Sequence, residues 1–156
     1  MRKILLLSCT ALFAVMSVAA FAQDVNAPIH QLLDGFNTGD MKAVSASYAK
    51  GDLSIVDEVP PFHWSGPNVG EAWGADLEKH DKAAGVTDAK VMYSSTVRSE
   101  TEGDRAYVVA KVQYVYKEKG KAMLEDAHMT FVLHREDNAW KIAGWVWSGE
   151  KPRAAK

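Results

Sequence analysis

The chain has 156 residues, with 18 basic and 20 acidic side chains and a formal net charge of −2. This length suits one domain with its own hydrophobic core. The slightly acidic balance and the absence of a long basic run argue against nucleic acid as a partner.

Residues 1–22 have the three parts of a cleavable signal peptide. Arg2 and Lys3 form the positive start, residues 4–18 are almost entirely apolar, and residues 20–22 carry the small side chains that signal peptidase accepts. The apolar stretch is shorter than the roughly 20 residues of a membrane-spanning helix. We therefore expect cleavage between Ala22 and Gln23, export to the periplasm or the exterior, and no membrane attachment afterwards.

Cleavage would also remove Cys9, the single cysteine of the chain. The mature protein would then have no disulfide and no thiol for nucleophilic or redox chemistry. Without Arg2 and Lys3 it keeps 16 basic and 20 acidic side chains.

Three helices are predicted in the first half of the mature chain. The first has a helical apolar stripe of Ile29, Leu32, Leu33 and Phe36. Asp40 is expected to cap the second, whose apolar side is formed by Met41, Val44 and Tyr48. A short strand over residues 53–56 ends before Pro60-Pro61. The third helix is expected from a capping box of Asn68 and Glu71 to Gly85, with an apolar face of Val69, Trp73, Leu77 and His80.

From residue 89 onward the apolar period changes to two. Residues 89–99, 105–117, 122–134 and 139–147 are predicted as strands, and the short turns between them require antiparallel neighbours. The predicted fold is α+β: a cone in which a curved antiparallel sheet, made of this four-stranded meander and the short strand, packs against three N-terminal helices. The domain spans residues 23–150, residues 151–156 are a basic C-terminal tail, and such a cone encloses a cavity.

Three segments of the chain resemble a known family. They are residues 36–40 between the first two helices, residues 64–66 before the third helix, and residues 130–142 in the last hairpin. Together, in this order, they resemble the nuclear-transport-factor-2-like superfamily in its SnoaL-like and ketosteroid-isomerase-like branch. The resemblance implies the same cone and, in many members, dimerisation through the convex sheet. Its activities range from isomerases, cyclases and dehydratases to domains that only bind or dimerise.

The sequence departs from the ketosteroid isomerases at their catalytic positions. The tyrosine acid of their first helix corresponds to Leu32 here, while Asp57 or Glu58 corresponds to the general base. The second acid would fall near His128 or Met129. These differences argue against steroid isomerisation. The last strand also lacks the histidine pair of many relatives, since it has Trp145 and Trp147 among residues 144–147.

Asp57, His63 and His128 are the candidate catalytic residues. Asp57 is either a base at the mouth of the cone or a solvated strand end. His63 and Trp64 lie in a proline-rich stretch that either roofs a pocket or plugs the cone. If the face of Asp126 and His128 points inward, the pair can do acid–base work. The alternation favours the opposite orientation, with a core of Met129, Phe131 and Leu133.

Aromatic residues supply the candidate ligand-binding set, which is Tyr48, Trp64, Trp73, Tyr114 and Tyr116. Trp145 and Trp147 share one face of the last strand and suit a dimer interface, or alternatively line the pocket. No cofactor and no metal are expected, because the five histidines show no ligand spacing; they are His30, His63, His80, His128 and His134.

Three functions follow from these residues. The leading hypothesis is an exported single-domain homodimer that binds a small apolar or aromatic molecule. The alternative is an isomerase, lyase or cyclase that uses Asp57 with His63 or His128. The third is a structural dimerisation or accessory domain of the cell envelope. The sequence leaves open whether the protein is an enzyme.

Overall fold

The computed structural model describes residues 24–155. The predicted signal peptide, with Cys9, lies outside this range. Within it, no helix has the length and apolar character needed to span a membrane. The elements in chain order are α1 (Ala27–Thr38), α2 (Met41–Ser47), β1 (Leu53–Val56), β2 (His63–Gly66), α3 (Val69–Ala84), β3 (Val86–Glu102), β4 (Arg105–Glu118), β5 (Lys121–Glu136), β6 (Ala139–Gly149) and β7 (Arg153–Ala154).

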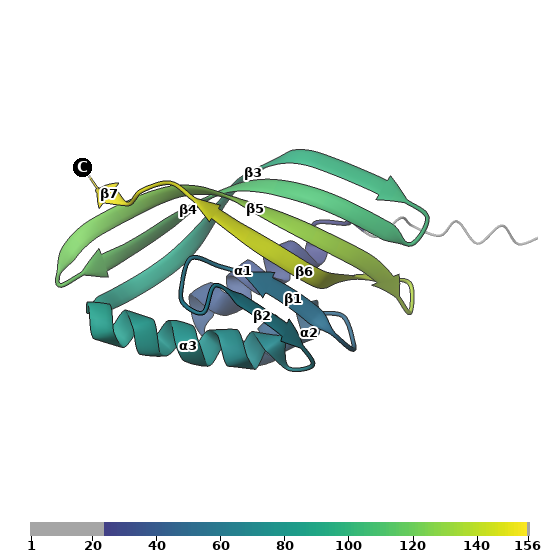
Figure 1. Cartoon of the computed structure of the whole chain (residues 1–156). Helices are drawn as coiled ribbons and strands as arrows, with labels where there is room; N and C mark the ends of the chain where they lie inside the picture. Colours follow the sequence, from purple (N-terminus) through teal and green to yellow (C-terminus); the bar gives the residue numbers. More distant parts are fainter. Residues whose placement is uncertain (1–23, 156) are drawn as a thin grey trace, which may run out of the picture.

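The strands form one curved sheet in the order β2-β1-β6-β5-β4-β3, and β7 pairs with β5. The long strands arch over α1 and α3, which cover the concave face (Figure 1). The predicted α+β cone is therefore confirmed. The sheet is mixed rather than wholly antiparallel, however, because β1 runs parallel to β6 and antiparallel to β2.

The junction of the two N-terminal helices lies where the sequence predicts, but α2 ends before Tyr48, which is extended and not part of its apolar side. Asp40 caps α2, since its side chain accepts a hydrogen bond from the backbone N–H of Ala43 at 3.0 Å. Gly39 ends α1 in the left-handed conformation, with φ of 73°. The apolar stripe of α1 faces the sheet, and Ile29 is fully buried.

α3 ends at Gly85 as predicted but starts differently. Asn68 has φ of 62° and its side chain makes no capping hydrogen bond, so the predicted capping box does not form. Only two residues of α3 are buried, Val69 and Trp73, and both lie in its N-terminal half. The C-terminal half is held at the edge of the core.

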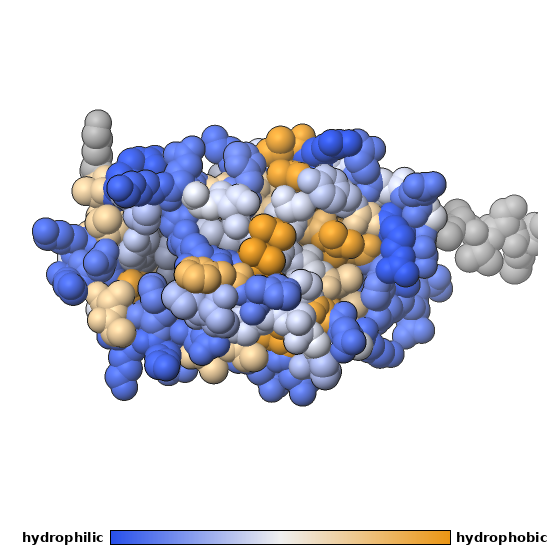
Figure 2. All heavy atoms as spheres, in the orientation of Figure 1, coloured by the Kyte–Doolittle hydropathy of each residue, from blue (hydrophilic) through white to orange (hydrophobic). Residues whose placement is uncertain are grey.

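The alternation along β4 and β5 sets the core. Inward side chains of β5 include Met129, Phe131 and Leu133, each at most 4% exposed, whereas the alternate residues His128 and Val132 are exposed. Buried Val108 of β4 pairs directly with Phe131. Hydrophobic side chains visible in Figure 2 lie mainly toward the middle of the molecule, and hydrophilic ones dominate both ends.

Candidate functional site

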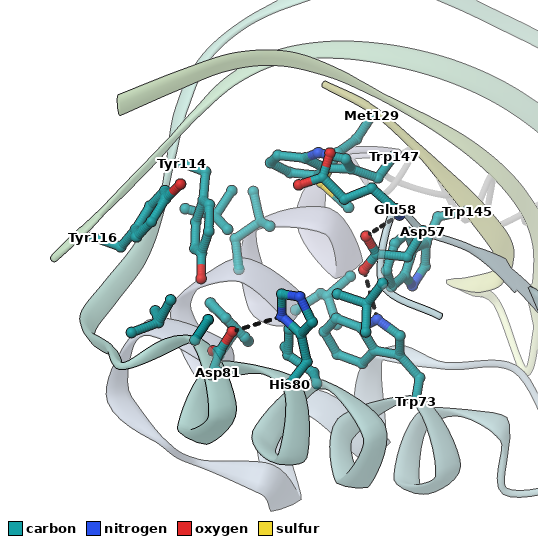
Figure 3. A pocket seen from close by; sticks show the side chains of 18 of the residues that line it. Asp57, Glu58, Trp73, His80, Asp81, Tyr114, Tyr116, Met129, Trp145 and Trp147 are labelled. Carbon is teal, nitrogen blue, oxygen red and sulfur yellow. Dashed lines mark hydrogen bonds and ion pairs between the residues drawn. The ribbon is translucent and has the colours of Figure 1, made fainter. Parts of the chain in front are cut away.

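A cavity of about 300 Å³ lies between the concave face of the sheet, α1 and α3. Figure 3 shows Tyr114 and Tyr116 at one end, and Trp73 and Trp145 at the other. The aromatic lining residues are Phe36, Trp73, Tyr114, Tyr116, Trp145 and Trp147. The acidic ones are Asp57, Glu58, Asp81 and Glu118. The cavity therefore combines aromatic walls with several carboxyl groups.

Asp57 lies where the chain leaves β1, and two donors hold its carboxyl group. Trp73 Nε1 donates to Oδ2 at 2.6 Å, and the backbone N–H of Glu58 donates to Oδ1 at 2.6 Å. Burial raises the pKa of Asp57, and the bond from Trp73 partly opposes this rise. The indole thus favours the ionised carboxylate inside an apolar wall.

Glu58 and Glu125 form a pair of acidic residues beside Asp57. Burial, followed by the charge of Glu125, raises the pKa of Glu58 to about 7. Glu125 on β5 is 0% exposed, and its Oε1 accepts a hydrogen bond from Trp147 Nε1 at 2.8 Å. Its Oε2 has no hydrogen-bond partner among the described residues. Burial raises the pKa of Glu125 as well.

Gly149 provides the space for the Glu125 carboxyl group. A Cβ atom at this position would overlap Glu125 Oε1. Gly149 ends β6, two residues after Trp147, so the same strand end supplies both the donor and the space. This arrangement holds Glu125 toward Glu58.

The wall formed by α3 carries an imidazole and a carboxyl group. His80 Nδ1 lies 3.5 Å from Asp81 Oδ1, and their side chains are 49% and 22% exposed. Burial raises the pKa of Asp81, and His80 opposes the rise. His80 also lowers the pKa of Asp57 through its charge, so α3 and the segment that follows β1 interact electrostatically across the cavity wall.

The aromatic side chains pack in two groups. Tyr114 stacks on Tyr116 with ring centroids 4.7 Å apart and is nearly perpendicular to Trp147, with an interplanar angle of 82°. Trp73 and Trp145 are also perpendicular, at 89° and a centroid distance of 5.0 Å. The Tyr114 hydroxyl is buried and has no hydrogen-bond partner among residues 24–155. Burial raises its pKa.

The predicted ligand-binding residues divide into two sets. Trp73, Tyr114 and Tyr116 line the cavity, whereas Tyr48 and Trp64 do not. Tyr48 is buried in the core and accepts a hydrogen bond from Trp145 Nε1 at 3.0 Å, and burial raises its pKa to about 12. Trp64 Nε1 donates to Asp76 Oδ2 at 2.9 Å. For Tyr48 and Trp64 the prediction is wrong, because both side chains fill the interior beside the cavity.

Asp57 lines the cavity, but neither predicted histidine joins it. His63 is exposed on β2, where its Nε2 lies 3.3 Å from Ser54 Oγ. His128 is exposed on the convex face because its neighbour Met129 points inward. An acid–base pair of Asp57 with His63 or His128 is therefore wrong.

Trp145 and Trp147 both face the cavity. Trp145 is 3% exposed and lies opposite Phe131 in the sheet register, on the inward side. Their predicted place on a convex dimer interface is wrong, and the alternative that both indoles line the pocket holds. The apolar pattern of β6 is compatible with either orientation of the two indoles, so only the pairing of β6 with its neighbours determines which face they occupy.

Sequence reasoning missed Glu125 and His80 as site residues, and it named Glu58 only as an alternative to Asp57 for the general base. Glu125 had a signal, since it falls in the same alternating series as Ala127 and Met129 and so is a carboxyl group on an apolar face. It lies near the strand position where the resemblance placed a second acid. Within the described part of the chain, no three His, Cys, Asp or Glu side chains are grouped as metal ligands.

Comparisons with known proteins agree on the fold. A ketosteroid isomerase-like protein from Erwinia carotovora atroseptica is 21% identical and superposes with a TM-score of 0.61, over 81% of this chain and 94% of that one. A hexachlorocyclohexane dehydrochlorinase (LinA) type 2 is 15% identical, with a TM-score of 0.64 over 84% and 88%. No curated protein sequence matches significantly. Residues 25–150 match the SnoaL-like domain, and the chain belongs to this family.

Proposed function

We propose that the protein binds a small, largely apolar molecule in the cavity and transfers a proton on it, as an isomerase or lyase does. One observation carries this proposal. The carboxyl groups of Asp57 and Glu58 are adjacent on the wall of an aromatic cavity, where burial raises the pKa of both. Acid–base catalysts are most effective with pKa values close to the working pH.

The surroundings of the two carboxyl groups support different roles. Asp57 receives two hydrogen bonds that stabilise its ionised form, which suits a general base. Glu58, with a pKa of about 7, exchanges a proton near neutrality and suits the returning acid. One proton leaves a carbon of the ligand for Asp57, and one is supplied by Glu58 elsewhere on it. The names of the two fold relatives, an isomerase-like protein and a dehydrochlorinase, are compatible with such chemistry.

A compound screen followed by hydrogen exchange tests the proposal. Thermal unfolding identifies small apolar or aromatic compounds that stabilise the protein, and NMR in D₂O then measures deuterium entering the bound compounds. We expect Asp57→Asn to reduce the exchange rate at least 100-fold while binding persists, a loss typical for a general base. Glu78→Gln, an exposed change on α3, is the control. Stabilisation without exchange would leave a binding protein, and no stabilising compound would reject the cavity as a site.

We propose, in addition, that the protein is exported and cleaved after Ala22. The support is the signal-like residues 1–22, with a positive start, an apolar stretch and small residues at the end. Mass spectrometry of the protein from a periplasmic extract is expected to give a chain that starts at Gln23. An intact N-terminus in that extract, or protein confined to the cytosol, would reject export.

A homodimer through the convex face is also proposed. Val132 and Tyr107 are paired across β5 and β4, and Val146 and Val56 are paired across β6 and β1. Their exposed fractions lie between 36% and 49%, which leaves a hydrophobic patch outside the core. Light scattering is expected to give a dimer for the wild type and a monomer for Val132→Glu. A monomeric wild type would contradict the proposal.

A further inference from the structure

We infer that the ligand of the cavity is a small organic cation, an ammonium group on an apolar or aromatic body. The inference rests on the proposed function, since it takes the cavity as the ligand site. It adds the charge of the ligand, which neither the family nor the fold specifies.

The first argument is the charge balance of the cavity wall. Four carboxyl side chains line it, and among the described residues no lysine or arginine does; His80 is the one basic lining residue. Surface carboxylates of the same chain do have basic partners. Asp88 is an example, since its Oδ2 lies 2.8 Å from Lys117 Nζ. A carboxylate that is partly removed from solvent without a counter-ion is unfavourable. The wall therefore favours a positive ligand, which would supply the missing counter-charge.

The second argument is the geometry of the aromatic rings. Trp73 is perpendicular to Trp145, and Tyr114 is perpendicular to Trp147. The rings of each pair pack edge to face against one another, and the negative face of an aromatic ring attracts a cation within about 6 Å of its centroid. Tryptophan is the strongest of these partners, and three tryptophans line the cavity. An ammonium group is better matched to this enclosure than a neutral methyl-rich group.

The third argument is a buried carboxyl group beside the cavity. Glu125 is fully buried, its Oε1 is occupied by Trp147, and its Oε2 has no partner among the described residues. Its charge acts directly on Glu58, which lines the cavity. A cation beside Glu58 would offset the mutual repulsion of the two carboxyl groups.

Three probes of nearly equal shape test the sign of the charge. They are benzyltrimethylammonium, its neutral isostere neopentylbenzene, and the anion phenylmethanesulfonate. Quenching of tryptophan fluorescence at pH 8 and low salt measures their dissociation constants. We expect the cation to bind at least tenfold more tightly than the isostere and the anion not to bind.

Variants then locate the preference. Glu58→Gln and, independently, Glu118→Gln are expected to reduce the ratio of cation to isostere affinity at least threefold, and the exposed control Glu78→Gln to leave it unchanged. Equal or tighter binding of the isostere would overturn the inference and leave the proposed function intact. So would failure of all three probes while neutral compounds from the screen bind. If no compound of any charge binds, the proposed function fails as well.

Discussion

The carboxyl group of Glu58 should make the protein less stable as the pH rises. In the folded state its pKa is raised from 4.5 to about 7, mainly by burial. The folded protein therefore binds more protons than the unfolded chain between these values, and the free energy of unfolding falls across this interval. For a fully shielded group the interval corresponds to about 3 kcal/mol. Because Glu58 is exposed, solvent screening reduces the expected effect to about 1–2 kcal/mol.

Glu58→Gln removes this ionisation. We expect the stability of the variant relative to the wild type to be about 1–2 kcal/mol greater at pH 8 than at pH 4. Urea unfolding followed by tryptophan fluorescence at pH 4, 6 and 8 measures this difference, with Glu78→Gln as the control on an exposed helix surface. A difference that is the same at every pH, or that the control reproduces, would refute a raised pKa at Glu58.

Three other substitutions test how the interior is held. Trp147→Phe removes the donor to the buried Glu125 carboxyl group, so urea unfolding at pH 8 is expected to show a loss of about 1–3 kcal/mol. Gly149→Ala places a Cβ over Glu125 Oε1 and is expected to lower stability by about 1–3 kcal/mol. Gly74→Ala in α3 meets nothing within 4 Å and is expected to raise it by about 0.5–1 kcal/mol. Thermal unfolding compares the two glycine variants, and the same sign for both would contradict the local packing.

Periodicity was sufficient to predict the elements that carry most of the core. The stripe of α1 and the alternation of β4 and β5 depend only on side-chain spacing, and the structure confirms which faces are buried. Alternation also separates Met129, which points inward, from the exposed His128. The same alternation puts Glu125 on the apolar face with Ala127 and Met129, a signal that sequence reasoning did not use.

What the sequence could not predict depends on contacts between distant segments. Strand β2 was not predicted because it lies in the proline-rich stretch, and the nearby sequence gives no sign that Trp64 pairs with Ile55. The parallel pairing of β1 with β6 likewise joins segments about 90 residues apart, as Ile55 and Trp145 are. The site depends on these pairings, since they turn Trp145 inward and bring the residues that follow β1 to the cavity. Asp57 could be predicted as a site residue from the sequence near it, whereas the residues around it in the cavity depend on the tertiary fold.

The uneven burial of α3 has a consequence for how a molecule enters the cavity. Val69 and Trp73 anchor the start of this helix, whereas its last two turns supply one wall, including Leu77 and Asp81, without a fully buried side chain. Local opening needs the least free energy where few apolar contacts are broken. The last two turns of α3 are therefore expected to open most readily, and the amide hydrogens of residues 77–84 should exchange with solvent faster than those of residues 73–76, which are hydrogen-bonded in the same helix. A bound ligand should slow that exchange, and this protection would report occupancy before any reaction is known.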